Sequence, residues 1–555
     1  MEERPKMQPT LGLTGVTVNA MALIAPGAFL WITFVLQAGY AFPSGLDMWP
    51  GLLLALVLAY ATAVSYSELA KLYPGAGSSY LFAEQAFLNN TQAYRFARIA
   101  KFIVGWASHL YYWVYPGVMV ATIGVMLGYI VGNFFPSVIN AAIPGPLFMA
   151  LMAILSAYAI SYIAFRGVTG STITNVVINV VQIAALLFFS ALAIAYRLGH
   201  PEGSTGLTLN DAGNTVKTVV HYSLQGDNPS HPSAWSVVFP HSFSWAMLQA
   251  TVAILLLVGF ESATALGEEA KDPKRDVPRG VLLSLTIQGL VCYMFEYFAA
   301  NYFLNSGYGL GSAKSSAAPV GDMMVIVGDA LLGNRGHVFM LLEALTVFLA
   351  LVGTTLSCIN TGARVTYAMG RDEELPTHFG LLHGRNLTPY RAIWTLATIS
   401  AVLGAYGAIY YFGGSAAPPD SAIAQLPHNI WYSVGIKSNA QLASLPNGLL
   451  LITLVSNFGT FVLYGLTNVI CIVAYAERHD FRGFRHGVIP VFGALANLAC
   501  LAFYVIGPFE GLGSVKEPLL ALVIAVIWGA YGWAYFAVTS RKRGRQTLLE
   551  SSRPA

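Results

Sequence analysis

Residues 259–280 read GFESATALGEEAKDPKRDVPRG, and they place one carboxylate, Glu261, in an apolar run that ends in a dense mixed-charge loop. From Trp245 to Leu266 this glutamate is the only charged residue. A run of about 20 mostly apolar residues is long enough to cross a bilayer as a helix. A carboxylate inside such a helix is costly, and it usually faces a cavity on a path for an ion, a proton or a substrate. The alternative is a protonated glutamate that ties two helices together.

The whole chain shares this apolar character. Of its 555 residues, 56% are hydrophobic and only 10% are charged, whereas about a quarter of the residues in soluble domains are charged. A β-barrel would show alternating segments of about ten residues, but the runs here are continuous. The sequence therefore predicts an all-α membrane protein with about twelve transmembrane helices, near residues 13–38, 48–70, 102–131, 147–165, 171–197, 243–266, 280–304, 337–369, 390–412, 447–475, 488–507 and 517–539.

Basic residues predict the orientation of these helices. If the N-terminus is cytoplasmic and the helices alternate, all but six of the 29 Lys and Arg residues lie on the cytoplasmic side; the six are Arg197, Lys217, Lys314, Arg335, Lys437 and Lys516. This asymmetry follows the positive-inside rule. We therefore expect a multi-pass protein of the cell membrane, specifically a cytoplasmic (inner) membrane, with both termini in the cytoplasm.

The apolar runs also divide the chain into segments of one membrane domain. We expect a cytoplasmic N-terminus, a first set of five helices, an outer loop, a second set of five helices, two further helices and a basic cytoplasmic tail; these are residues 1–12, 13–197, 198–242, 243–475, 488–539 and 540–555.

Two of the predicted helices contain residues that interrupt a helix. Pro26 and Gly27 lie near the middle of the first, and Gly259 precedes Glu261 in the sixth. Proline removes a backbone donor, and glycine favours irregular backbone. Interrupted helices at corresponding places in two halves indicate the central site of a secondary transporter. A plain kink supported by neighbouring helices is the alternative.

Three loop motifs make the chain resemble a known superfamily. They are YSELAKLYPGAGSSYLFAEQAF at 66–87, GEEAKDPKRDVPRG at 267–280 and GARVTYAMGRDEELPTHF at 362–379. All three are similar to segments of the amino acid, polyamine and organocation (APC) transporter superfamily. The resemblance implies a leucine-transporter-like fold, with a 5+5 inverted repeat, broken helices one and six, and two C-terminal helices. It also implies a permease, an antiporter or symporter that moves an amino acid by alternating access.

The resemblance implies a substrate site at the two breaks. In the family, backbone N–H groups of broken helix one hold the substrate carboxylate; the matching positions are Ala25, Pro26, Gly27 and Ala28. Pro26 departs from the family pattern because it supplies no N–H. The sixth-helix break would meet the substrate amine; it comprises Val258, Gly259, Phe260 and Glu261.

Aromatic residues of the third predicted helix are candidates for the wall of this site. Tyr111 and Tyr112 lie in the sequence HLYYWVYPG. Aromatic faces attract ammonium groups, so these two side chains could line a cavity that holds an amine. An aromatic belt at the membrane interface is the alternative.

Transport could be coupled in three ways: to sodium, to a proton or by exchange. In sodium-coupled relatives of the fold, hydroxyls of helix eight help to bind the ion, and Thr354, Thr355 and Ser357 are the matching candidates. Short hydroxyls also bond to their own helix backbone. Glu261 could instead carry a proton, and obligatory exchange would need no ion. The lysine that some proton-coupled members carry on helix five is absent from residues 171–197.

The charged loop after helix six is a candidate cytoplasmic gate. Its alternating signs suit a local salt-bridge network that re-pairs as helices tilt, and the candidates are Glu268, Glu269, Lys271, Lys274 and Arg275. Exposed pairs contribute only about 0–1 kcal/mol each, which suits a reversible gate. A solvated turn that obeys the positive-inside rule is the alternative.

Enzyme chemistry has little support in the sequence. Phosphate-loop, nucleophile-elbow and zinc-protease motifs are missing from it, so we expect no enzyme activity, cofactor, metal or nucleic-acid partner. The expected partners are a small-molecule substrate, the lipid bilayer, and a coupling proton or sodium ion, with a homodimer left open. A polyamine or cationic amine transporter, or a sensor or channel on the same fold, are the alternative functions.

Overall fold

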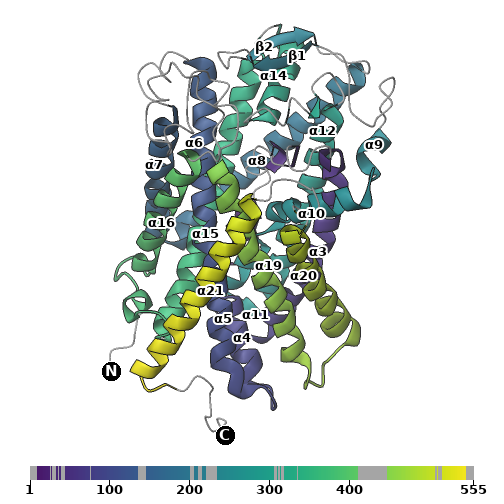
Figure 1. Ribbon diagram of the computed structural model, residues 1–555. Helices are drawn as coiled ribbons and strands as arrows, with labels where there is room; N and C mark the ends of the chain where they lie inside the picture. Colours follow the sequence, from purple (N-terminus) through teal and green to yellow (C-terminus); the bar gives the residue numbers. More distant parts are fainter. Residues whose placement is uncertain are drawn as a thin grey trace.

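The computed structural model describes residues 9–545 with internal gaps. The gaps are 25–26, 28–32, 36, 39–43, 76, 136–144, 201–204, 210–214, 220–233, 305–308, 311–312, 314–317, 334, 410–446, 507–508 and 510–515. Figure 1 shows long helices running side by side, with a small hairpin at one end and the last residues of α21 at the other. We call the end of the bundle that carries the end of α21 the inner end, following the predicted orientation.

Helices make up almost all of the described chain. Eleven of them are long and apolar enough to span a membrane, and α1 is a shorter apolar helix. The elements of the first half are α1 (Leu13–Ile24), η1 (Ser44–Asp47), α3 (Met48–Leu72), α4 (Ser79–Leu88), η2 (Tyr94–Phe96), α5 (Ala97–Tyr112), α6 (Tyr115–Phe134), α7 (Gly145–Arg166) and α8 (Val168–Gly199).

The second half continues the helical pattern. Its elements are α9 (Ala234–Val238), α10 (Phe243–Leu257), η3 (Phe260–Leu266), α11 (Pro273–Leu285), the π-helix η4 (Thr286–Tyr293), α12 (Met294–Phe303), α14 (Pro319–Leu332), α15 (His337–Arg371), η5 (Thr377–Gly380), α16 (Tyr390–Ile409), α19 (Asn447–Tyr475), the π-helix η6 (Gly483–Val488), α20 (Ile489–Ile506) and α21 (Lys516–Lys542). The predicted all-α membrane class is confirmed.

The outer loop contains the one hairpin in the described part of the chain. Strands β1 (Thr205–Leu209) and β2 (Thr215–Val219) pair antiparallel, and Figure 1 places them at the end of the bundle opposite to the end of α21. Residues 198–242 are expected from the sequence only as a loop, so the hairpin is a feature that the sequence does not predict.

Helix six is broken where the sequence predicts. The α-helix α10 ends at Leu257, Val258 is extended, and Gly259 has φ +130° before the 3-10 helix η3 begins. Only glycine adopts such a φ at little cost. A Cβ atom at Gly259 would lie 2.8 Å from the backbone N of Ile24. The sixth-helix break therefore packs directly against the last turn of α1.

Backbone hydrogen bonds join the inner ends of helices one and six. The Leu11 N–H donates to the Glu269 carbonyl (2.9 Å), and the Lys271 N–H donates to the Leu11 carbonyl (2.7 Å). The two segments form a parallel bridge between Leu11 and Ala270. The start of the first helix is thus attached to the charged loop that follows the sixth.

Candidate functional site

Glu261 lies fully buried at the break and accepts three hydrogen bonds. Its Oε2 accepts from the Tyr464 hydroxyl (2.6 Å) and the Gly259 N–H (2.9 Å). Its Oε1 accepts from the Tyr112 hydroxyl (3.1 Å). The break creates this geometry, because an unwound turn exposes the Gly259 N–H to a side chain two residues later. All three donors are neutral, so no cation of the described chain balances a charge on Glu261.

Aromatic rings surround this carboxylate. The rings of Tyr66 and Tyr464 are 5.9 Å apart, and Phe260 lies 5.9 Å from Tyr66 and 5.3 Å from Tyr464. With Tyr112 and Glu261 these residues form what we call the Glu261 cluster, and every member is buried. An ammonium group here would meet one carboxylate and several aromatic faces, which attract cations.

Tyr66 is held in the cluster by two further elements. Its hydroxyl accepts from Ser79 at the start of α4 (2.7 Å) and lies 3.2 Å from the hydroxyl of Thr467 on α19. Sequence reasoning missed Tyr66 and Tyr464 as site residues. The available signal was a tyrosine in the middle of an apolar run, a place where a hydroxyl needs a partner.

Tyr111 and Tyr112 belong to the interior and not to an interface belt. Both are buried, and their rings lie 4.4 Å apart. Tyr112 reaches Glu261, whereas the Tyr111 hydroxyl has no hydrogen-bond partner in the described part of the structure. Of the two predicted wall residues, the structure brings only Tyr112 into hydrogen-bond contact with the Glu261 carboxylate.

The helix-one half of the predicted site is only partly visible. Ala25, Pro26 and Ala28 lie outside the described residues. Gly27 is described and buried, and a Cβ atom there would lie 2.9 Å from Leu186 Cδ1 and 3.3 Å from Ala350 Cβ. Gly27 thus permits close packing of helix one against α8 and α15.

The three hydroxyls of α15 have different partners. Thr354 Oγ1 lies 3.1 Å from the Ala22 carbonyl of helix one and 3.0 Å from the carbonyl of Ala350. Thr355 donates to Leu351 on its own helix (2.7 Å). Ser357 accepts from an asparagine of α8. Only Thr354 therefore joins helix eight to a backbone carbonyl of helix one.

A chain of buried side-chain amides joins helix five to its neighbours. Asn175 donates to Asn19 of α1 (2.9 Å) and to Ser357 of α15 (3.0 Å). Asn179 accepts from Gln182 (3.0 Å) and from Gln288 of η4 (2.8 Å). Sequence reasoning missed this network, although amides at spacings of four and three residues in an apolar run place them on one helix face.

The charged loop pairs with α15 and not with itself. Arg364 donates to both oxygens of Glu269 (2.8 and 3.1 Å), and Arg371 lies 3.2 Å from Glu268. The other three predicted gate residues, Lys271, Lys274 and Arg275, form no ion pair in the part of the chain that is described. The prediction of a local network in this loop is therefore wrong, because the arginine partners come from a distant helix.

Further ion pairs extend across the inner end. Arg98 of α5 donates to both oxygens of Glu374 (2.8 and 3.1 Å). Lys101 pairs with Glu84 and, at 3.2 Å, with Asp372. Arg545, just after α21, lies 2.5 Å from Glu373. With the two pairs of the 267–280 loop, we call these contacts the inner ion pairs.

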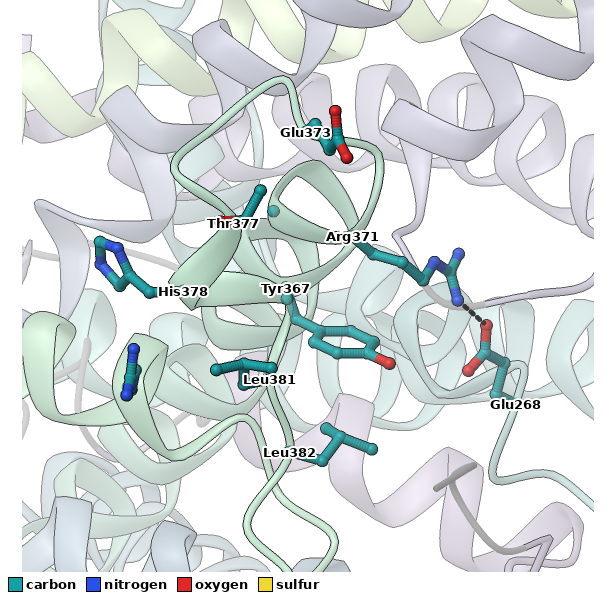
Figure 2. Close-up of a pocket in the computed structure, with 11 residues that line it drawn as sticks. Glu268, Tyr367, Arg371, Glu373, Thr377, His378, Leu381 and Leu382 are labelled. Carbon is teal, nitrogen blue, oxygen red and sulfur yellow. Dashed lines mark hydrogen bonds and ion pairs between the residues drawn. The ribbon is translucent and has the colours of Figure 1, made fainter. Parts of the chain in front are cut away.

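A pocket of about 640 Å³ opens beside one of the inner ion pairs. Figure 2 shows the Arg371–Glu268 pair at its edge and Tyr367 between that pair and the η5 segment. Its other lining residues are Gly370, Glu373, Thr377, His378, Gly380, Leu381, Leu382 and Arg391. The pocket is separate from the Glu261 cluster, with which it shares no residue.

Known proteins similar to the chain are transporters. A family described as amino acid permease matches residues 10–531. The branched-chain amino acid permease BcaP of Bacillus subtilis is 25% identical, covering 95% of this chain and 92% of its own length. The low-affinity putrescine importer PlaP of Escherichia coli is 25% identical, covering 72% of this chain and 75% of its own length. The methylthioribose transporter of Bacillus subtilis is 25% identical, covering 89% of this chain and 86% of its own length.

Proposed function

The chain belongs to the amino acid permease family of membrane transporters, and we propose that it is a secondary active transporter that moves an amino acid across the cell membrane by alternating access. The observation that carries the proposal is Glu261, a buried carboxylate at a helix break that has only neutral donors and lies among aromatic rings. Both termini are cytoplasmic in this proposal, as the distribution of basic residues indicates.

The substrate amine binds at the Glu261 cluster. The carboxylate attracts the ammonium group, and the rings of Phe260, Tyr112 and Tyr464 enclose it. The substrate carboxylate points toward the break that the sequence predicts in helix one near Gly27, because transporters with broken helices direct half-helix N-termini at anionic substrate groups. One carboxylate in the cluster suits a substrate with one ammonium group.

Coupling follows from the same carboxylate. When the amine leaves, Glu261 is a buried acid with three neutral donors and no cation, and a proton replaces the ammonium charge. The protein then works as a proton-coupled transporter or as an exchanger. Sodium coupling is the competing route, and it would use Thr354 and the Ala22 carbonyl, which lie 3.1 Å apart.

The inner ion pairs act as the cytoplasmic gate. Glu269 and Glu268 follow helix six, and their arginine partners lie on α15. Any tilt of helices one and six away from α15 has to separate these pairs. The Arg364–Glu269 pair is buried and the Arg371–Glu268 pair is half-exposed, so the former determines most of the cost of opening.

Polyamine transport is the second candidate function. It is favoured by the similarity to a putrescine importer, and by the lack of a cationic partner for Glu261 among the described residues. A diamine needs two acceptor sites, and among the described residues Glu261 is the one carboxylate in contact with the cluster. The amino acid is therefore the better match to this geometry.

Uptake by the purified protein in liposomes tests both functions. Labelled amino acids and putrescine are offered while pH and sodium are varied independently, and Glu261→Gln and the surface variant Asp480→Asn are measured in parallel. We expect saturable amino acid uptake that loses about tenfold or more in Glu261→Gln, equivalent to at least 1.4 kcal/mol of binding, and that loses its pH dependence. Asp480→Asn keeps both properties.

Three results would contradict the proposal. Movement of putrescine without any amino acid would establish the polyamine alternative. Sustained ion currents without saturation would indicate a channel. Protein that neither binds nor moves any of these compounds under proton, sodium or exchange conditions would remove the transporter proposal altogether.

A further inference from the structure

The cavity of about 640 Å³ beside the Arg371–Glu268 pair is shaped by the main chain, and we call it the η5 pocket. The η5 segment folds back on the end of α15, and two glycines meet where the segments cross. A Cβ atom at Gly370 would lie 2.6 Å from the backbone N of Gly380, and one at Gly380 would lie 2.8 Å from the backbone N of Arg371. Cavities of about 300–1,000 Å³ hold small molecules, so the η5 pocket is large enough for a ligand.

The side chains that line the η5 pocket leave an excess of positive charge. Glu268 is paired with Arg371 (3.2 Å), and Glu373 is paired with Arg545 (2.5 Å), so both carboxylates of the lining are neutralised. Arg391, in the first turn of α16, also lines the pocket and forms no ion pair in the described part of the chain. Its charge is therefore available to an anion that enters the pocket.

Neutral donors accompany Arg391 in the η5 pocket. Thr377 and His378 line it, and neither side chain has a hydrogen-bond partner among the described residues. The Nε atom of Arg391 donates to the Tyr390 hydroxyl (2.9 Å), which leaves the terminal guanidinium nitrogens for a ligand. A guanidinium group can donate to two oxygens of a phosphate at once. A phosphate, with its charge and its several acceptor oxygens, matches this set of donors.

Aromatic residues beside the η5 pocket indicate the level of the membrane interface. Trp394 follows Arg391 by about one turn of α16, and its ring lies 5.9 Å from Phe165 and 6.5 Å from Tyr158 in the inner half of α7. Tyr158 and the nearby Tyr162 are exposed. Exposed tyrosine and tryptophan rings are typical of the boundary between bilayer and water. The pocket therefore lies at the level of the lipid headgroups.

The η5 pocket also has an apolar side. Leu381 and Leu382 line it together with the ring of Tyr367 (Figure 2), and Leu381 is 48% exposed. A soluble anion would leave these apolar groups uncovered, whereas a phospholipid carries a phosphate and an apolar chain in one molecule. Basic pockets between transmembrane helices on the cytoplasmic side are known to hold anionic headgroups. The combination favours a lipid over a free anion.

A phosphate in the η5 pocket would compete for Arg371. In Figure 2, His378 lies on the far side of Tyr367 from the Arg371–Glu268 pair, so the donors and this pair face the same cavity from different sides. The pair is half-exposed, and exposed pairs contribute little to stability. A phosphate can therefore replace Glu268 as the partner of Arg371.

We propose that the η5 pocket binds the phosphate of an anionic phospholipid from the leaflet at the inner end, with Arg391, His378 and Thr377 as donors, and that the bound phosphate competes with Glu268 for Arg371. The apolar part of the lipid covers Leu381. Lipid binding itself is independent of any substrate. Its effect, which is to loosen one of the inner ion pairs and so favour opening of the cytoplasmic gate, rests on the proposed transport function.

Native mass spectrometry of the purified full chain tests the site without a substrate. Dioleoylphosphatidylglycerol is titrated against the protein in detergent, and dioleoylphosphatidylcholine, whose headgroup has no net charge, is titrated in parallel. Arg391→Gln removes the cation that has no acidic partner, and Leu381→Glu adds a negative charge at an exposed position without removing a donor. The matched control is Arg385→Gln, which removes an exposed charge from the same loop but not from the pocket lining.

We expect the wild type to prefer phosphatidylglycerol. Arg391→Gln and Leu381→Glu should each weaken its binding about tenfold, as the loss of a hydrogen bond to a charged group does, while Arg385→Gln binds it like the wild type. Glu268→Gln should bind it more tightly, because Arg371 loses the carboxylate that competes with the phosphate. Asp480→Asn, which removes a surface carboxylate outside the pocket, should leave the affinity unchanged.

Four results would overturn parts of this proposal. Equal binding of the two lipids, or equal losses in Arg391→Gln and Arg385→Gln, would reject the site. Full displacement of the lipid by millimolar inorganic phosphate would reject a lipid as its ligand. Unchanged affinity in Glu268→Gln would reject the competition for Arg371. If Arg391→Gln does not fold, Leu381→Glu still decides the question. Failure of amino acid uptake would reject the transport proposal and leave these binding measurements interpretable.

Discussion

The carboxylate of the Glu261 cluster has neutral partners, whereas carboxylates in the inner ion pairs have cationic partners. Glu261 is surrounded by hydroxyls and one backbone N–H. Glu269 and Glu374, by contrast, each receive two hydrogen bonds from an arginine. A carboxylate with neutral donors keeps its charge available for a ligand or a proton. A carboxylate that is already paired with an arginine instead holds two segments of the chain together. In the proposed function, this difference separates the substrate site from the cytoplasmic gate.

Gly259→Ala is expected to have the largest effect, because it breaks the geometry that sets the Glu261 cluster apart. Its φ of +130° strains any residue with a side chain, by about 1–3 kcal/mol, and the new Cβ would lie 2.8 Å from backbone atoms of helix one. We expect little folded protein and no uptake, measured by size-exclusion chromatography and in liposomes. Gly529→Ala on α21, where a Cβ meets nothing within 4 Å, is the matched control and should behave like the wild type.

Arg364→Met tests the inner ion pairs, and it is expected to have the second-largest effect. It leaves Glu269 buried without its cation, and removing one partner of a buried pair costs about 3–5 kcal/mol. Arg371→Met removes the partner of half-exposed Glu268, where the expected cost is only about 0–1 kcal/mol. Thermal unfolding of both variants in the same detergent measures the difference. Equal losses in the two variants would show that burial does not distinguish these pairs.

Tyr464→Phe tests whether the hydrogen bond from the neutral Tyr464 hydroxyl to Glu261 stabilises the folded protein. The hydrogen bond is 2.6 Å long, and a bond to a charged group contributes about 1.5–3 kcal/mol. We expect a loss of this size in the free energy of unfolding if Glu261 is ionised, and about half of it if Glu261 is protonated. Tyr111→Phe removes a hydroxyl that has no hydrogen-bond partner in the described structure, and it should cost little. A larger effect in Tyr111→Phe would contradict the assignment of the cluster.

The smallest effect is expected at the exposed pair of Arg478 and Asp480, between α19 and η6. The hydrogen bond from Arg478 lowers the pKa of Asp480 below its ordinary value of 3.8. A lowered folded-state pKa stabilises the protein above the unfolded-state pKa, and this contribution disappears as the pH falls through the folded-state pKa. At pH 7, the Arg478→Gln variant should therefore unfold at a slightly lower temperature than the wild type. In acid, the two proteins should unfold at the same temperature. A difference that persists in acid would mean that Arg478 acts through other contacts.

Much of the fold could be predicted because it depends on local composition. Continuous apolar runs set the membrane spans, and Gly259 beside Glu261 indicated the break that the structure shows. Both signals are contained in a few neighbouring residues. The inverted repeat is a relation between distant halves, and it stays a prediction of the family resemblance.

The partners within the site could not be predicted, because they depend on which helices meet. Tyr464 lies 203 residues from Glu261 along the chain, and no periodicity in either helix indicates that they touch. The same holds for Arg364, which replaces the predicted neighbours Lys271 and Lys274 as the partner of the charged loop. Sequence patterns identify which face of a helix is polar, but not what packs against it.

The bridge between Leu11 and Ala270 has a consequence for biogenesis. Leu11 emerges from the ribosome first, but the carbonyl of Glu269 and the N–H of Lys271 that complete its backbone pairing are made roughly 260 residues later. At about 5–20 residues per second, this delay is roughly 10–50 s. During that time the backbone groups of Leu11 lack this pairing, so the attachment of the first helix to the charged loop forms only after the second half of the chain has been made.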